Sequence, residues 1–228
     1  MTLFQYRAES ELQREAPLAA RMRPRTFDEL VGQDHIVGSG KVLRKSIESD
    51  RIPSMVFWGP PGSGKTTLAY LISSLTRSHF SALSAVGSGV TELRSVAVEA
   101  KERLGMHGRR TILFIDEIHR FNKAQQDVIL PHVEDGTLIF IGATTENPSF
   151  EVISPLLSRA TVFTLNPLSD LQVKEIVSRA LKDEERGLGL ANVRMDDEVI
   201  EVLVAAANGD ARNVLNSLEL AVAATDSD

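Results

Sequence analysis

The stretch that most constrains the fold is residues 54–67, where an apolar run meets a glycine-rich loop and then a helix-forming segment. The run at 55–58 is typical of a strand buried on both faces. The loop reads Gly-Pro-Pro-Gly-Ser-Gly-Lys-Thr, the pattern G-x-x-x-x-G-K-S/T whose backbone N–H groups surround phosphate oxygens. The N-terminus of the following helix adds partial positive charge at the same place. This order predicts a nucleoside triphosphate site rather than an ordinary glycine-rich turn.

Each side chain of the loop has an expected role. Lys65 is expected to bind the β- and γ-phosphates, and the Thr66 hydroxyl to hold Mg²⁺. The predicted nucleotide-binding residues of this segment are Gly59, Pro60, Pro61, Gly62, Ser63, Gly64, Lys65, Thr66 and Thr67.

Composition narrows the class of protein. The 228 residues contain no cysteine, which excludes disulfides, thiol catalysis and cysteine-based zinc modules. No apolar run has the length of a membrane span and the N-terminus is unlike a signal peptide, so we expect a cytoplasmic protein without a membrane partner. The net charge of −6 offers no basic face overall, so any DNA contact must come from a local patch or from assembly.

Strand patterns alternate with helical patterns as far as residue 165, which predicts an α/β fold with a parallel five-stranded sheet flanked by helices. The expected strands are 55–58, 79–83, 111–115, 137–142 and 162–165. Only helical patterns follow, so a small three-helix lid domain is expected. The predicted division is a disordered tail at 1–16, a nucleotide-binding domain at 17–167 and the lid at 168–228.

Helix boundaries are marked by capping residues. Asn122 with Gln125 and Ser169 with Gln172 are typical capping boxes, and Asp210 is expected to cap the last helix. Pro131 is expected to break or kink the helix that starts after Asn122.

Polar residues follow two of the buried strands, at the sheet edge where ligands bind in such folds. Asp116 ends the strand at 111–115 and is expected to bind Mg²⁺, directly or through water. Glu117 is next along the chain and is expected to orient and deprotonate an attacking water. The pair taken alone is also compatible with an ordinary strand end. Beside the loop it predicts hydrolysis rather than transfer of phosphate to another substrate.

Three further residues have both a catalytic and a structural interpretation. The Thr145 hydroxyl could bond the γ-phosphate or the water, or simply end a strand. Arg159 precedes the last strand and would ordinarily be a solvated surface residue. Arg212 could reach phosphate from the first turn of the last helix, or form a surface ion pair.

With these motifs in this order, the chain resembles an AAA+ ATPase of the clamp-loader clade. Asp-Glu-Ile-His-Arg-Phe-Asn-Lys-Ala-Gln-Gln-Asp at 116–127 and Gly-Ala-Thr-Thr-Glu-Asn-Pro-Ser-Phe-Glu at 142–151 are more specific. They resemble the family of replication-associated recombination protein A and the Werner helicase-interacting protein. The resemblance runs from about Pro17 to Val222.

The resemblance implies ATP and Mg²⁺ as cofactors and assigns further roles. Val31 and Gly32 match the segment that cradles adenine, and Thr145 matches sensor 1. Arg159 matches the arginine finger, which acts in trans on a neighbouring subunit, and Arg212 matches sensor 2. Lys65, Glu117, Thr145, Arg159 and Arg212 are therefore the expected catalytic residues, with Thr66 and Asp116 on the metal.

The family implies a DNA-dependent, DNA-stimulated ATPase acting at stalled or gapped replication forks and DNA ends, in the bacterial nucleoid. Its expected partners are DNA forks, ends or single-strand/duplex junctions, and single-strand DNA-binding protein. Family members form homo-oligomers through a C-terminal region absent here, so we expect this chain to be monomeric or weakly associating and slow. Candidate DNA contacts are Lys101, Arg103, Arg109 and Arg110.

Two other functions stay open. One is a clamp-loader subunit, although this chain has Ser-Arg-Ala where clamp loaders typically have Ser-Arg-Cys, and lacks the zinc module of some of them. The other is a nucleotide-dependent scaffold that binds ATP but hydrolyses little. Such a scaffold would not need Glu117, a carboxylate that activates water.

Overall fold

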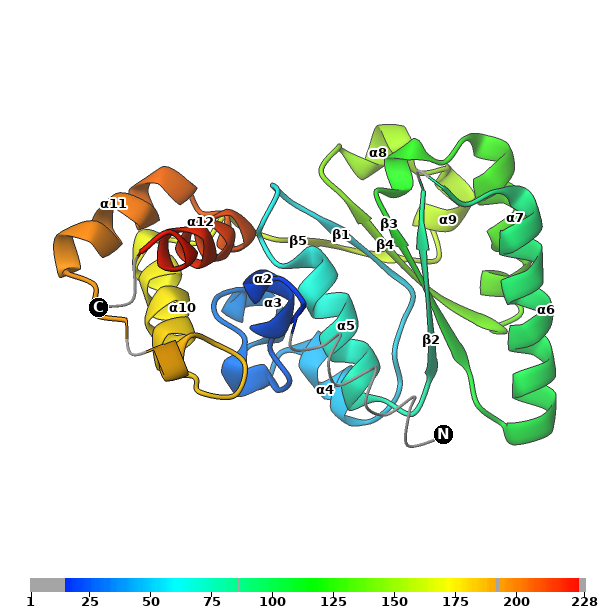
Figure 1. The fold of residues 1–228 in the computed structure, drawn as a ribbon. Helices are drawn as coiled ribbons and strands as arrows, with labels where there is room; N and C mark the ends of the chain where they lie inside the picture. The colour runs from blue at the N-terminus through cyan, green and yellow to red at the C-terminus, as the bar shows by residue number, and fades with distance from the viewer. Residues whose placement is uncertain (1–14, 86, 192, 226–228) are drawn as a thin grey trace. The chain divides into compact units, whose positions relative to one another are not determined.

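The computed structural model describes residues 15–85, 87–191 and 193–225; the predicted tail at 1–16 lies almost entirely outside them. The chain separates into two compact units (Figure 1). The α/β unit contains Arg25–Phe27 and Gln33–Asn166. The helical unit contains 15–24, 28–32 and the residues from Pro167 onward, so it includes two segments that we had expected in the nucleotide-binding domain. Within the described residues, no helix has the length and apolar character needed to cross a membrane.

The α/β unit is built on one five-stranded sheet with the order β2-β3-β4-β1-β5, and all its pairings are parallel. This confirms the predicted fold class. The strands are β1 (Met55–Trp58), β2 (His79–Ser84), β3 (Thr111–Asp116), β4 (Leu138–Thr144) and β5 (Thr161–Thr164). β3, β4 and β1 are neighbours, and their carboxyl ends therefore meet at one edge of the sheet.

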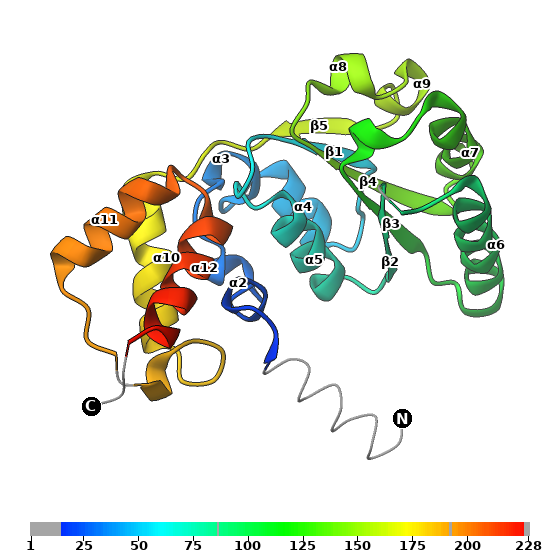
Figure 2. The same cartoon turned by 45° about the horizontal axis from the view of Figure 1, so that its top comes forward.

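Helices cover both faces of this sheet, with α4 and α5 on one side and α6 and α7 on the other (Figures 1 and 2). The side chains of the central strands alternate accordingly. Leu113 and Ile115 join the core shared with α6 and α7, whereas the Phe114 ring lies 6.3 Å from the Tyr70 ring of α5. Period-two alternation with apolar residues on both sides is what a doubly covered parallel sheet requires.

The helix predicted after Asn122 begins at Lys123, as its capping box indicates, and it continues further than expected. α6 extends to His107 and ends at Gly108, whose φ of +60° suits a glycine. α7 continues through Pro131 to Glu134, so the helix does not break there; the proline lacks one N–H donor, but its carbonyl still accepts the Asp135 N–H at 3.0 Å. The alternative of a kink stays a prediction. The bounds are α3 (Asp34–Val37), α4 (Val42–Glu48), α5 (Lys65–Leu75), α6 (Val90–His107), α7 (Lys123–Glu134), α8 (Pro148–Glu151) and α9 (Ser154–Leu157), with 3₁₀ turns η1 (Phe27–Glu29) and η2 (Ile118–Arg120).

In its described residues, the helical unit packs three long helices and one short one around its own apolar core. These are α2 (Leu18–Arg21), α10 (Asp170–Lys182), α11 (Asp197–Ala207) and α12 (Ala211–Ala223), with a 3₁₀ turn η3 (Gly189–Ala191). Leu18 of α2 is fully buried among residues of α10 and α12. Arg21 donates to Glu219 of α12 at 3.0 Å, which explains why the segment near residue 20 belongs to this unit.

Candidate functional site

The glycine-rich loop connects the buried strand β1 to the N-terminus of α5, as the motif predicts. Its first residue lies against the backbone of the neighbouring chain segment: a Cβ on Gly59 would be 2.4 Å from the Leu165 carbonyl oxygen, so no larger residue fits there. The Lys65 side chain is buried, and its Nζ donates to the carbonyl oxygens of Gly59 (2.8 Å) and Pro60 (2.7 Å). The ammonium is thereby held inside the loop, where the motif places phosphate.

The two residues expected on the metal lie together. The Thr66 hydroxyl, in the first turn of α5, donates to Oδ2 of Asp116 at the end of β3, at 3.1 Å. The other oxygen of the same carboxylate, Oδ1, accepts the Glu117 backbone N–H at 3.1 Å. Asp116 therefore ties the loop helix to the first residue after β3.

This pair fits a magnesium ion. A hydroxyl and a carboxylate are hard oxygen ligands, and Mg²⁺ is usually held by one or two such groups together with substrate phosphates and water. Among the residues that the structure describes, no group of three or more His, Asp or Glu side chains could form a separate metal centre. The donor set therefore suits a metal that arrives with a nucleotide.

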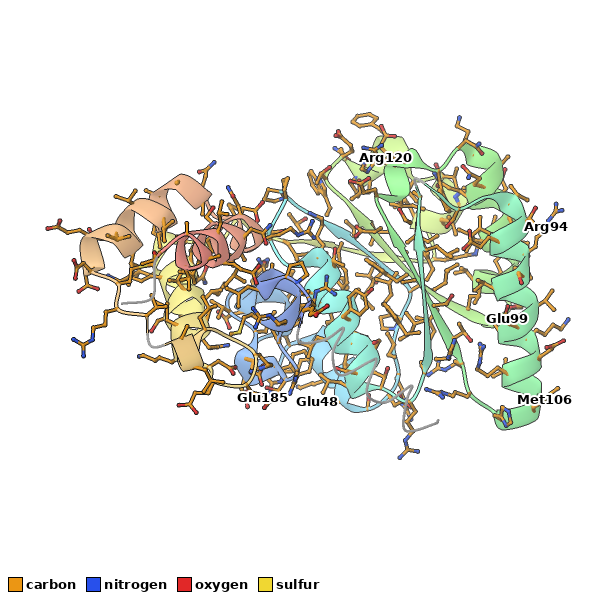
Figure 3. All side chains as sticks on the ribbon, viewed as in Figure 1. Glu48, Arg94, Glu99, Met106, Arg120 and Glu185 are labelled. Atoms are coloured by element: carbon orange, nitrogen blue, oxygen red, sulfur yellow. The ribbon has the colours of Figure 1, made fainter. Side chains whose placement is uncertain are left out.

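Glu117 has an unusual backbone and a partner that was not predicted. Its φ is +55°, in the left-handed region that is uncommon for a residue with a side chain. Its Oε2 accepts from Nε of Arg120 at 2.8 Å, and both side chains are about half exposed. Arg120 lies at the same end of the sheet as α8 (Figure 3). An exposed ion pair of this kind contributes ~0–1 kcal/mol, so Glu117 can leave it at low cost.

The end of β4 lies beside the start of the loop. The Gly59 N–H donates to the Thr144 carbonyl at 3.3 Å, and the Trp58 indole N–H donates to the Thr145 carbonyl at 3.3 Å. Thr145 is exposed, whereas Thr144 is buried and its hydroxyl lies 3.0 Å from Nδ1 of His119. Asp116, Thr145 and the loop thus follow three adjacent strands.

Arg159 lies in the loop between α9 and β5 and is not part of this cluster of contacts. Its guanidinium pairs with Glu134 at the end of α7 at 2.7 Å and donates to the Pro155 carbonyl at 2.8 Å. The Arg159 and Glu134 side chains are 41% and 44% exposed. The arginine is therefore available on the outside of the unit.

The remaining predicted residues belong to the helical unit. Val31 and Gly32 lie in its segment 28–32, and Arg212 lies in the first turn of α12. The Arg212 backbone N–H donates to the Asp210 carboxylate at 2.8 Å, so the predicted cap of this helix is present. The capping boxes at Asn122 and Ser169 are present as well.

Sequence reasoning missed three residues that touch the site. His119 and Arg120 lie inside the stretch 116–127 that carries the family resemblance, but nothing in the pattern shows that they bond Thr144 and Glu117. Gln33 donates to the Ser63 carbonyl of the loop at 3.1 Å. Its partner lies 30 residues away, and a lone glutamine gives no signal of such a contact.

The similarity to known proteins agrees with this geometry. Replication-associated recombination protein A of Haemophilus influenzae is 50% identical over 206 residues, covering 90% of this chain and 46% of that protein. ATPase WRNIP1 of Dictyostelium discoideum is 43% identical over 209 residues, covering 92% of this chain and 24% of that protein. The chain thus spans about half the length of the bacterial relative and about a quarter of the length of the Dictyostelium protein. These relatives confirm the resemblance found in the sequence.

The fold has counterparts among solved structures. The RuvB Holliday junction branch migration motor of Thermotoga maritima superimposes with a TM-score of 0.71 at 27% identity, covering 87% of this chain and 64% of that one. Residues 22–166 match the family model described as the Holliday junction DNA helicase RuvB P-loop domain. The chain therefore belongs to the family of the RuvB P-loop domain, with its AAA ATPase fold.

Proposed function

We propose that this chain is the ATP-hydrolysing part of a DNA-dependent AAA+ ATPase that acts in replication and recombination, at stalled or gapped forks and at DNA ends. The observation that carries the proposal is the contact between Thr66 and Asp116, which joins the phosphate-binding loop to the strand end that bears Glu117. The names of the relatives supply the biological setting, because both a recombination protein and an ATPase are among them.

In this proposal Thr66 and Asp116 hold Mg²⁺, which when bound would neutralise charge on the phosphates. Lys65 exchanges its bonds to the Gly59 and Pro60 carbonyls for bonds to phosphate oxygens. Glu117 leaves Arg120, accepts a proton from the attacking water and directs its oxygen at the γ-phosphorus, so that the bond to the β-phosphate oxygen breaks. Thr145 positions the water or the γ-phosphate, and Val31, Gly32 and Arg212 complete the nucleotide site.

The hydrolytic part is tested by replacing Glu117. Glu117→Gln keeps the shape of the side chain but cannot take a proton, so ATP turnover should fall by at least about 100-fold. Binding of ATP, followed with a fluorescent analogue, should change less than about threefold, because the substitution leaves the loop and the metal ligands in place. Glu99→Gln, on the solvent side of α6 (Figure 3), is the matched control and should retain full turnover. Unchanged turnover in Glu117→Gln would reject the assigned base.

The DNA-dependent part needs a separate measurement. ATP turnover is compared without DNA and with single-stranded, blunt duplex and forked DNA of equal nucleotide content. We expect forked DNA or DNA ends to stimulate turnover most. Equal rates in all four samples would be compatible with ATP hydrolysis but would exclude its stimulation by DNA in this part of the protein. Binding to single-strand DNA-binding protein, and a location in the cytoplasm with the nucleoid, belong to the same proposal.

A further inference from the structure

The Gln33 side chain is occupied entirely by backbone groups of two distant segments. Its Nε2 donates to the Ser63 carbonyl at 3.1 Å and to the Asn166 carbonyl at 2.8 Å, and its Oε1 accepts the Asn166 N–H at 3.1 Å. Gln33 is 6% exposed. It is also the N-cap residue of α3, yet its side chain does not cap that helix. Its backbone has φ +62°, which a residue with a Cβ rarely adopts.

The contact with Ser63 acts on the phosphate-binding loop. In a trans peptide the C=O and the next N–H point in opposite directions from one rigid plane. By holding the Ser63 carbonyl, Gln33 fixes the direction of the Gly64 N–H, one of the donors that the motif uses for phosphate. If the loop changes shape on nucleotide binding, the hydrogen bond between the Ser63 carbonyl and the Gln33 amide must therefore change with it.

The contact with Asn166 acts on the chain where it passes between the units. Two of the places where the chain passes from one unit to the other are the peptides Gly32–Gln33 and Asn166–Pro167. Pro167 has no N–H, so the Asn166 carbonyl is the sole hydrogen-bonding group of the Asn166–Pro167 peptide. On the helical side the same two segments also meet: a Cβ on Gly32, whose φ is +77°, would lie 2.9 Å from the Leu168 side chain.

We propose that Gln33 is a positioning residue that couples the phosphate-binding loop to two connections between the α/β unit and the helical unit. The nucleotide state of the loop is transmitted through one amide side chain, because the Ser63 and Asn166 carbonyls share its two N–H donors. The inference rests on the proposed function, which identifies the nucleotide as ATP. What it adds is the route by which nucleotide binding at the loop affects the helical unit.

The test is hydrogen exchange of the whole chain, with and without a non-hydrolysable ATP analogue and Mg²⁺, in Gln33→Glu and Gln33→Met. Glu would place a carboxylate against two carbonyl oxygens, and Met has similar length but no strong donor or acceptor. At saturating nucleotide, both variants should keep the exchange response at 59–66. The nucleotide-dependent change in hydrogen exchange at 166–182 should fall by about fivefold, because a hydrogen bond of this kind typically contributes about that factor to an equilibrium.

Gln126 provides a matched control within the same unit. It is 1% exposed, donates to the Phe121 and Glu151 carbonyls at 3.0 and 2.9 Å, and accepts the Ile153 N–H at 2.9 Å. Gln126→Glu and Gln126→Met therefore remove an equivalent set of bonds elsewhere. They should lower the thermal midpoint but keep the nucleotide response at 166–182, whereas a purely structural role for Gln33 would make the two sets of variants behave alike.

Three results would overturn the coupling: a normal response at 166–182 in the Gln33→Met variant, an equal loss in the Gln126 variants, or no response there in the wild-type chain although nucleotide binds. Nucleotide affinity is measured in the same samples with a fluorescent analogue. It distinguishes these three results, which concern the coupling alone, from a failure of the proposed function. A wild-type chain that binds no ATP would overturn that function, and the coupling with it.

Discussion

At the scale of single residues, the Thr66 hydroxyl gives the most direct test, because it both contacts Asp116 and is expected on the metal. Thr66→Val keeps the branched shape but removes the oxygen. We expect ATP turnover to fall by about 10–100-fold, the loss that is typical when a group that holds or orients a metal is removed. The measurement is turnover as a function of Mg²⁺ concentration. Thr76→Val, at the other end of α5, is the control, and a loss of the same size there would show that the effect is not metal binding.

A second residue predicts a pH dependence. Burial, and then the positive charges of Arg103 and Arg109, lower the pKa of His79 in the folded chain below its ordinary value of 6.5, against an opposing effect of Glu99. The unfolded chain then binds the proton at a higher pH than the folded chain. The free energy of unfolding is therefore highest above the ordinary histidine pKa and falls as the pH drops through it towards the lower folded value.

Urea titrations at about pH 7.5 and about pH 5.5 lie on either side of the ordinary histidine pKa. His79→Gln should reduce the loss of stability between them, and Arg109→Gln should reduce it partly, because one cause of the lowered pKa is gone. Arg110→Gln is the comparison: this guanidinium donates to the Asp50 carbonyl and is not among the causes. A wild-type slope in His79→Gln would contradict the assignment.

At the scale of elements, the starts of α7, α10 and α12 were predictable because their capping signals are local. Asn122 and Ser169 lie three residues before the glutamines that complete their capping boxes, and the structure has both. The strand ends that bear Asp116 and Thr145 follow from apolar runs of similar locality. Contacts such as Gln33 with Asn166, 133 residues apart, depend on how distant segments pack, and no local pattern encodes them.

The cap of α12 gives the prediction at this scale. The Asp210 carboxylate accepts the backbone N–H groups of Arg212 and Asn213 at 2.8 and 3.0 Å. Asp210→Ala should lower the free energy of unfolding by about 1 kcal/mol, because two N–H groups of the first turn lose their acceptor. Asp210→Asn keeps an oxygen in place and should cost only a few tenths of a kcal/mol. Equal losses in urea titrations of the two variants would show that the cap contributes nothing specific.

At the scale of the whole molecule, the family resemblance implies that a positive group reaches the γ-phosphate from a neighbouring subunit. Arg159 is the candidate, and it pairs with Glu134 on the exposed side of α7 and α9. A pair this exposed contributes ~0–1 kcal/mol, so a neighbouring copy can compete for the guanidinium. Turnover per chain should consequently rise with chain concentration, whereas a site complete within one subunit would give a constant rate.

Mixing two inactive variants decides where Arg159 acts. Arg159→Ala leaves the phosphate-binding loop intact but removes the finger, and Lys65→Ala does the reverse. If the finger acts in trans, each variant alone should be nearly inactive. An equal mixture at high concentration should recover up to about a quarter of wild-type turnover, because random pairing in a head-to-tail interface joins an intact loop to an intact finger in one contact of four. The measurement is turnover of the mixture against the two variants alone and against wild type at the same total concentration. No recovery, in a range where the wild-type rate rises with concentration, would place Arg159 outside the neighbouring site.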